Sequence, residues 1–300
     1  MDWISGMQKA IDYIENNITN ELHYDEIAKI GCSSSYHFQR VFSLLCNCTL
    51  GEYIRNRRMT LAGAELAAGK IKVLEAAFKY GYDSPDSFSR AFVKFHGITP
   101  SSARDPGANL RTFSRVSMKI MMEGGSMMDY KIEEKPEMIL TGYKRRFTGT
   151  PAERFEQECE FYVTTRINQY ILKGLAHDCD TGYSIMTNFD DEGYDFYISS
   201  LLNEWTRNNL EKELGSAKEA GRFKNITVPA QLYVICETER TKYPTMLFME
   251  LRKRMVTEWL PSSDYMLAEA PEISVLHWFS PKNSGNRYIE LWIPVVKRDV

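Results

Sequence analysis

The sequence lacks a long apolar run. No stretch of the 300 residues reaches the ~18 consecutive apolar residues that a membrane-spanning helix needs. The first residues alternate apolar and charged side chains and do not form the apolar core of a signal peptide. We therefore expect no membrane partner and a cytoplasmic location. Six cysteines are too few for a disulfide scaffold in a chain of this length, so we expect reduced thiols.

The sequence also lacks the residue clusters that carry common types of catalysis. It has no recognisable Ser-His-Asp or Cys-His constellation, and Cys46 and Cys48 have no second pair or histidine cluster at a zinc-ligand spacing. We expect no catalytic residues, no metal and no cofactor. The net charge of −3 excludes neither nucleic acid nor other partners, because a local basic face can neutralise phosphates even when the total charge is near zero.

The first third of the chain contains a repeat at an offset of 50 residues. Residues 27–50 align without a gap on residues 77–100. The identical pairs are Lys29 and Lys79, Gly31 and Gly81, Ser34 and Ser84, Phe38 and Phe88, Arg40 and Arg90, Phe42 and Phe92, and Thr49 and Thr99. In each copy a glycine ends one short helix and a serine can cap the next, which predicts a helix-turn-helix. Two such units suit a periodic target, and duplex DNA is one.

The helical periodicity predicts a long helix between the two copies. The expected helices are residues 3–18, 24–30, 34–45, 50–68, 73–80 and 85–95, with a short one near Pro100. The connecting helix, residues 50–68, would be roughly 28 Å long at ~1.5 Å per residue. Successive major grooves on one face of DNA lie roughly 34 Å apart. The spacing is of the right order, and a slightly short spacing would bend the duplex.

In each copy the second helix has an outward side that could read bases. In the first copy the outward residues are Ser35, Tyr36, Gln39 and Arg40, and in the second they are Asp86, Ser87, Ser89 and Arg90. Glutamine can pair with adenine, and arginine with guanine, in the major groove. The alternative is an ordinary solvated helix face, but the gapless duplication favours base reading.

The rest of the chain repeats at an offset of 93 residues, with few identities. The matching positions are Tyr130 and Phe223, Pro136 and Pro229, Pro151 and Pro244, and Phe155 and Phe248. Each copy reads as strand, proline, strand, helix and two more strands. The expected helices are 151–173 and 244–259, and the expected strand pairs are 182–187 with 194–201 and 272–279 with 287–296. We predict residues 107–126 as a linker with a first hairpin strand, followed by an α+β domain at 127–300.

The strand near the end of the chain places a carboxylate between aromatic rings. Alternation along this strand puts Tyr288, Glu290 and Trp292 on one face. A carboxylate flanked by aromatic rings suits a bound cation, by charge and by the ring quadrupole. Further candidate walls of this effector site are Tyr183, Tyr197 and Trp278; the offset of 93 matches Tyr197 with Glu290. The alternative is a solvent-exposed sheet face.

Residues 1–106 resemble the AraC/XylS-type DNA-binding domain. The resemblance is carried by SSYHFQRVF, LGEYIRNRRMTLA, GYDSPDSFSRAF and GITPSSAR. It implies two helix-turn-helix units on a linker helix, and a protein that binds and bends double-stranded DNA as an activator or repressor. By matching position, it assigns base contacts to Tyr36, Gln39, Arg40, Pro85, Asp86 and Arg90.

Residues 107–300 resemble GyrI-like effector-binding domains, which are related to SHS2 modules. The carrying segments are MDYKIEEKPEMILTGYKRRF and RYIELWIPV, and the domain order is similar to that of Rob-type regulators. In related domains a strand carboxylate inside an aromatic pocket meets lipophilic cations, and Glu290 is the matching residue.

Together these features predict two domains. The first is all-α, and the second is α+β with an antiparallel sheet and two long helices. We expect a transcriptional regulator that is not an enzyme. It would bind double-stranded DNA as a monomer, a small effector such as a lipophilic cation, and RNA polymerase. Two alternatives stay open for the second domain. One is hydrolysis of small electrophiles by Glu290 with Tyr197 or Tyr288, and the other is a protein-binding module.

Overall fold

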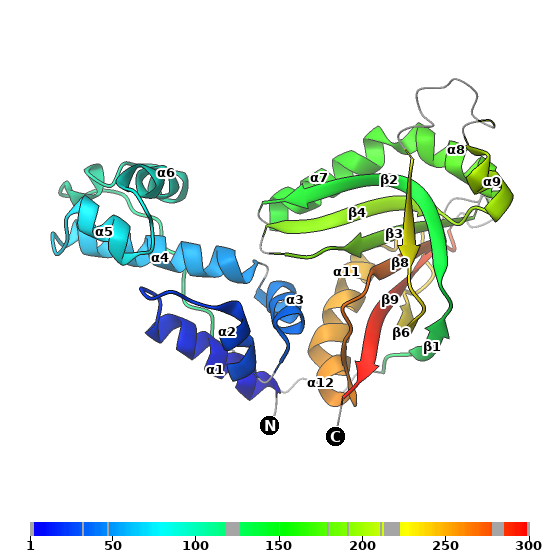
Figure 1. Ribbon diagram of the computed structural model, residues 1–300, viewed down its shortest axis with the longest axis horizontal. Coiled ribbons are helices and arrows are strands. Elements are labelled where there is room, and N and C mark those ends of the chain that lie inside the picture. Colours follow the sequence, from blue (N-terminus) through cyan, green and yellow to red (C-terminus); the bar gives the residue numbers. More distant parts are fainter. Residues whose placement is uncertain are drawn as a thin grey trace. The chain divides into compact units, whose positions relative to one another are not determined.

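The chain divides into two compact units, Met1–Met122 and Glu123–Val300, which are described separately (Figure 1). The computed structural model describes residues 3–31, 33–46, 48–117, 127–149, 151–178, 180–190, 192–210, 212, 223–277 and 285–298. Across those ranges, no helix is both long and apolar enough to cross a bilayer.

The first unit is helical throughout, as the sequence predicts. Its elements are α1 (Trp3–Asn16), α2 (Tyr24–Ile30), α3 (Ser35–Cys46), α4 (Leu50–Ala67), α5 (Val73–Lys79), α6 (Pro85–His96) and the short 3-10 turn η1 (Ser102–Arg104). Helices α2 and α3 form the first helix-turn-helix, α5 and α6 form the second, and α4 joins them (Figure 1).

Local signals in the sequence explain where these helices begin and end. The Thr49 hydroxyl accepts a hydrogen bond from the Glu52 backbone N–H, and the Glu52 carboxylate accepts one from the Thr49 backbone N–H, so α4 begins with a capping box. The Ser84 hydroxyl caps α6 by accepting from the Ser87 backbone N–H, and Pro85 lies in the first turn. Gly97 ends α6 at φ 79°, a left-handed conformation that costs glycine little.

The second unit is α+β with an antiparallel sheet, which confirms the expected fold class. Its strands are β1 (Lys131–Lys135), β2 (Met138–Thr148), β3 (Thr181–Thr187), β4 (Gly193–Ser200), β5 (Lys224–Val228), β6 (Gln231–Glu237), β7 (Tyr265–Leu267), β8 (Glu272–His277) and β9 (Tyr288–Lys297). Its helices are α7 (Pro151–Thr164), α8 (Arg166–Ala176), α9 (Glu204–Asn208), α11 (Thr245–Arg254), the π-helical turn η3 (Met255–Trp259) and α12 (Leu260–Ser262).

The strand order shows the internal duplication. The order is β1-β6-β9-β8-β3-β4-β2-β5, with β7 paired to β9. The equivalent strands of the two copies are β1 and β5, β2 and β6, β3 and β8, and β4 and β9. The series of equivalent strands is therefore the same from either end, and β8 of the second copy lies beside β3 of the first. The first strand of each copy pairs within the other copy: β1 with β6, and β5 with β2. This exchange joins the two copies into one sheet.

The long helix expected at residues 151–173 is broken near Thr165 into α7 and α8. The hydroxyls of Thr164 and Thr165 donate to the carbonyls of Glu160 and Phe161. Such bonds from threonine side chains to the preceding turn bend helices. A hydrophobic pattern does not reveal this break, because the apolar face continues through it.

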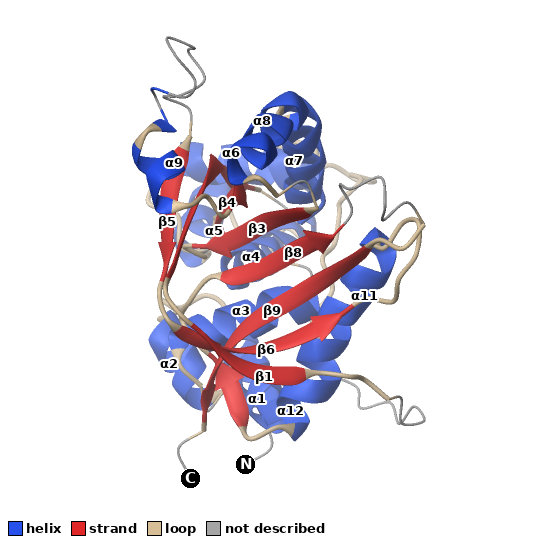
Figure 2. Ribbon diagram, turned by 90° about the vertical axis from the view of Figure 1, so that its right-hand side faces the viewer, coloured by secondary structure: helices blue, strands red, loops and turns tan. Residues whose placement is uncertain are grey.

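The two faces of the sheet have different cores. On one face, Phe161 of α7 and Leu172 of α8 pack on a cluster that includes Phe147 and Phe196. The cluster on the other face, which includes Tyr197, Tyr233 and Trp292, contains strand residues and no helix residue. The sheet is strongly curved in Figure 1, and Figure 2 shows β3, β8, β9 and β6 side by side in it. The curvature lets the strand residues bury one another.

The described part of the expected linker, residues 108–117, forms no regular element. The first hairpin strand expected by residue 126 falls mostly on residues 118–126, which lie outside the described ranges. The described part is held to the first unit by hydrogen bonds. Phe113 donates to the Thr60 hydroxyl, and the Val116 backbone donates to the Tyr53 hydroxyl.

Candidate functional site

The expected reading helices keep most of their candidate side chains accessible. In α6, Asp86 and Arg90 are exposed, while Pro85, Ser87 and Ser89 are half-buried. Ser87 also hydrogen-bonds to Ser84 at the helix start, which orients the first turn. The second helix-turn-helix therefore presents one acidic and one basic group from the same helix.

In α3, Ser35, Tyr36 and Gln39 are half-buried. The Gln39 amide donates to the Ser35 hydroxyl at 3.2 Å, so the two residues act as one polar surface. Gln39 keeps an amide oxygen and a second N–H for other partners.

The outward position expected for Arg40 is wrong. Arg40 is only 7% exposed and already takes part in interactions. The expectation came from the helix alone, where Arg40 lies opposite Phe38 and Phe42. Its long side chain, however, can be covered by elements outside the helix, and helical periodicity carries no information about them. Of the two arginines that the repeat aligns, only Arg90 is exposed.

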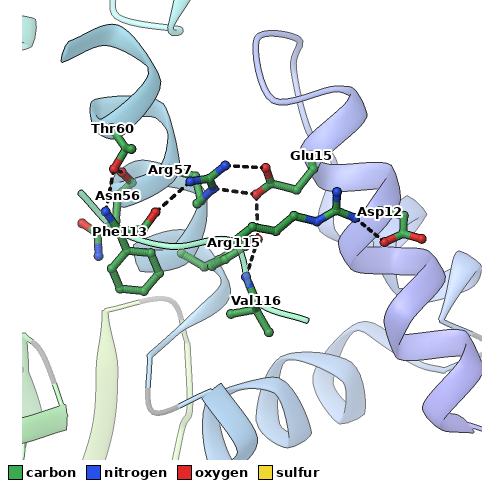
Figure 3. Close-up of polar contacts among 9 residues, drawn as sticks. Asp12, Glu15, Asn56, Arg57, Thr60, Phe113, Arg115 and Val116 are labelled. Atoms are coloured by element: carbon green, nitrogen blue, oxygen red, sulfur yellow. Dashed lines mark hydrogen bonds and ion pairs between the residues drawn. The ribbon is translucent and has the colours of Figure 1, made fainter. Parts of the chain in front are cut away.

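Arg57 and Arg58, two basic residues of α4, have structural partners. Arg57 donates to Glu15 through Nε and Nη2, both at 2.8 Å, and Nη1 donates to the Phe113 carbonyl (Figure 3). Arg58 donates to the backbone carbonyls of Ile18 and Asn20. The basic residues left exposed in this unit include Arg55, Arg90, Lys94 and Arg104.

The contact between Arg57 and Glu15 ties α4 to α1. Burial raises the pKa of the Glu15 carboxyl, but hydrogen bonds from Arg57 and Tyr53 outweigh it and leave the pKa below its ordinary value. Arg115 adds an ion pair with Asp12, one turn earlier on α1 (Figure 3). This network positions both helix-turn-helix units through their connecting helix.

Glu290 lies on the face of the sheet whose hydrophobic cluster contains no helix residue among the described ones, here called the helix-free face, and its side chain is 15% exposed. His277 Nε2 lies 2.7 Å from Oε1, and the Trp292 indole N–H donates to Oε2 at 2.8 Å. Burial raises the pKa of Glu290, but the contacts with His277 and Trp292 outweigh it and leave the pKa below its ordinary value. Glu290 is thus a partly buried, hydrogen-bonded carboxylate.

The aromatic residues expected around Glu290 lie on the same face, in two rows. The register places Glu290, Val275 and Tyr183 in one row across β9, β8 and β3. Tyr197 lies in the adjacent row, with Trp292, because Trp292 pairs with Ile273, Ile273 with Ile185, and Ile185 with Tyr197. Tyr183 is therefore in line with Glu290, whereas the Tyr197 expected from the repeat is one row away.

Tyr288 stacks on His277, with ring centroids 4.2 Å apart, and the Arg240 guanidinium lies over the Tyr288 ring. Lys135 lies over Trp292, 4.5 Å from its ring centroid. Trp278 is outside the described residues. His277 was missed by the sequence reasoning because it belongs to β8, and only the strand register brings it to Glu290.

A second carboxylate cluster lies where α7, α11 and β8 meet. Arg252 of α11 forms an ion pair with Glu272 of β8 at 2.8 Å, and Glu272 is 2% exposed. Glu158 of α7 is near both. Burial raises the pKa of Glu158. The positive charge of Arg252 lowers it and the negative charge of Glu272 raises it further, and the resulting pKa is about 7.

The raised pKa of Glu158 predicts a pH dependence of stability. Because the folded protein holds this proton more tightly than the unfolded chain, the contribution to stability is present at low pH. It is lost as the pH rises towards and through about 7, a change of up to about 3 kcal/mol. Urea unfolding at pH 5 and pH 8 should show this loss in the parent, and Glu158→Gln should remove it. An equal pH dependence in both proteins would contradict the assignment.

Known proteins match both units. Residues 27–105 match a helix-turn-helix domain, and residues 131–295 match the integron-associated effector binding protein family. The transcriptional activator AarP of Providencia stuartii is 42% identical over 107 residues, which cover 35% of this chain and 79% of AarP. The regulatory protein SoxS of Salmonella typhimurium is 38% identical over 98 residues, which cover 33% of this chain and 92% of SoxS.

The chain belongs to the AraC-type helix-turn-helix family of transcriptional regulators. Its second unit is a GyrI-like effector-binding domain. This regulator is also similar to a solved structure of SAV2435 bound to tetraphenylphosphonium, at 13% identity and a TM-score of 0.43, over 56% of this chain and 94% of that one. The family matches and the relatives AarP and SoxS confirm the AraC-type and GyrI-like resemblances of the sequence.

Proposed function

We propose that this DNA-binding regulator reads two successive major grooves with α3 and α6. The observation that carries the proposal is the repeat itself, with equivalent helices at the two ends of α4. Helix α4 has 18 residues and is roughly 27 Å long, near the ~34 Å of one DNA turn. Gln39 and Tyr36 are the base-reading candidates of α3, and Asp86, Ser89 and Arg90 those of α6.

The proposal further includes binding as a monomer, since one chain already carries two readers. It places the protein in the cytoplasm, with RNA polymerase as a partner. The naming of the relative AarP as an activator supports a role in activation.

We propose that the effector is a small lipophilic cation held on the helix-free face of the sheet. Glu290 supplies the charge, and Tyr183 and Tyr197 supply aromatic surface on the same face. A cationic ligand would take the place of Arg240 over the Tyr288 ring and of Lys135 over the Trp292 ring. The lowered pKa of Glu290 supports this, because the carboxylate stays ionised at neutral pH. An effector regulates only if it binds the active and inactive states with different affinity.

A binding role without catalysis fits the contacts of Glu290 better than hydrolysis does. A general base needs a free oxygen within hydrogen-bond reach of the proton that it removes. Both oxygens of Glu290 already have partners in His277 and Trp292. Of the two tyrosines in the hydrolase scheme, Tyr197 lies in a different row of the sheet from Glu290, and the Tyr288 ring is stacked on His277 with Arg240 over it.

The charge of Glu290 can be tested with tetraphenylphosphonium and a neutral aromatic ligand of similar size. We expect Glu290→Gln to weaken the cation by about tenfold or more, the loss of one partly buried charge contact, and to leave the neutral ligand unchanged. Isothermal titration calorimetry on the full chain measures both. Glu250→Gln removes an exposed carboxylate from α11, away from the face of Glu290; it is the matched control and should change neither. Equal weakening of both ligands by Glu290→Gln would reject the charge argument.

A further inference from the structure

A pocket on the opposite side of the sheet from Glu290 has the reverse charge. It has a volume of about 390 Å³, within the range of small-molecule sites. Its walls come from both copies of the internal repeat: α7 and α8 on one side, and the loop into α11 with the residue before β9 on the other. The lining residues are Tyr162, Arg166, Gln169, Tyr170, Lys242, Tyr243, Pro244, Thr245 and Arg287.

Three of these lining residues are cationic and none is acidic. The Nε of Arg287 is buried and has no hydrogen-bond partner among the described residues. The Tyr162 hydroxyl is already bonded to Ser184, and the Gln169 amide donates to the Tyr162 carbonyl. The polar groups that can meet a ligand are therefore mainly those of Arg166, Lys242 and Arg287. Arg287 Nη1 donates to the Lys242 carbonyl, and the positive charge of the guanidinium at the pocket wall favours an anion.

Two helix starts meet at the same pocket. Helix α8 begins with Arg166, and α11 begins with Thr245. Neither start has a side-chain cap, and neither first turn contains an acidic residue. The N-terminus of a helix carries partial positive charge, so an arginine in the first turn of α8 is placed unfavourably. A bound anion would offset this unfavourable charge interaction, and the partial positive charge at both helix starts would stabilise the anion.

The rim of the pocket is apolar. The rings of Tyr170 and Tyr243 line it and are largely exposed, and Ile167 and Met246, next to Arg166 and Thr245, are each 77% exposed. An inorganic anion would not use these surfaces, whereas a ring attached to a carboxylate would cover them.

We propose that this pocket binds a small aromatic carboxylate as a second effector. The carboxylate meets Arg166, Lys242 and Arg287, and its ring lies against Tyr170 and Tyr243. The pocket joins the two copies of the repeat, so its occupant contacts both halves of the sheet. It does not share a residue with the cation site proposed around Glu290.

Isothermal titration calorimetry of the full chain with naphthoate, and with the neutral naphthamide of the same shape, tests the proposal. We expect one naphthoate per chain, and binding at least about tenfold weaker for naphthamide. Arg166→Gln and Lys242→Gln should each weaken naphthoate by about tenfold, because each removes a charged partner from an exposed position that the fold does not need. Lys253→Gln, an exposed charge on α11 outside the pocket, should have no effect.

Equal affinity for naphthoate and naphthamide would overturn the proposal. So would unchanged naphthoate binding in both Arg166→Gln and Lys242→Gln. Glu290→Gln separates the two sites: naphthoate binding should survive it, and tetraphenylphosphonium binding should survive Arg166→Gln. Loss of naphthoate binding in Glu290→Gln would place the anion on the other face and reject the pocket.

Discussion

Replacing Gln39 and Arg90 together with alanine is expected to weaken operator binding by about 2–6 kcal/mol. Each single substitution should cost about 1–3 kcal/mol, the discrimination carried by one base-reading side chain. Because α3 and α6 lie at opposite ends of α4, the two losses should add. Each single variant should also relax the base preference at a different position, one groove apart. Binding to a randomised operator library, followed by titration, measures both effects.

A change in sequence preference separates base reading from general attraction to DNA. Lys94→Ala is the matched control, because Lys94 is exposed one turn after Arg90 on the same helix. We expect this control to weaken all sequences nearly uniformly, as a phosphate contact does. If Gln39→Ala and Arg90→Ala behaved like Lys94→Ala, the side chains would not be reading bases. Arg40→Ala is expected to alter folding before it alters specificity, since Arg40 is 7% exposed.

Replacing Glu272 with alanine is expected to lower the free energy of unfolding of the second unit by about 3–5 kcal/mol. Glu272 is 2% exposed and pairs with Arg252, so the substitution leaves a buried guanidinium without its nearest carboxylate. Glu158 lies close enough to replace part of that charge, which favours the lower end of the range. Urea unfolding followed by tryptophan fluorescence reports this unit, since four of the five tryptophans follow residue 200.

Two further variants decide whether the loss comes from an unpaired charge. Glu250→Ala removes an exposed carboxylate from α11 and should change stability by less than about 0.5 kcal/mol. The double variant Arg252→Met with Glu272→Leu removes both charges and should recover most of the loss, because apolar residues can replace a buried ion pair. A double variant as unstable as Glu272→Ala would show that packing, not charge, holds this position.

Particular patterns in the sequence predicted most of the architecture. The helical periodicity and the offset of 50 residues predicted the helix-turn-helix units, because short helices depend on local caps such as Thr49 and Ser84. The offset of 93 predicted equivalent strands and helices in the second unit. It did not predict the exchange of β1 and β5 between the copies, since strand pairing is set by contacts distant in sequence. Nor did it reveal the break at Thr165.

The candidate sites show the same division between local and distant information. Alternation along one strand predicted that Glu290 shares a face of the sheet with Tyr288 and Trp292. Its contact with His277 required the register of β8 on β9. Similarly, helical spacing predicted which sides of α3 and α6 face outward. The burial of Arg40 and the pairing of Arg57 with Glu15 depended on neighbouring elements.

By itself, the amino-acid sequence determined the two repeats, the helices and strands that they contain, and the family of DNA-binding regulators to which the chain belongs. These depend on residue spacing and on motifs within short segments. The tertiary structure alone decided which charges are available. It engaged Arg57, Arg58 and Glu290 with partners, buried Glu272 with Arg252, and brought Arg166, Lys242 and Arg287 together around one pocket. The physical reason is that Coulomb interaction and burial depend on distance in space, which separation along the chain does not specify.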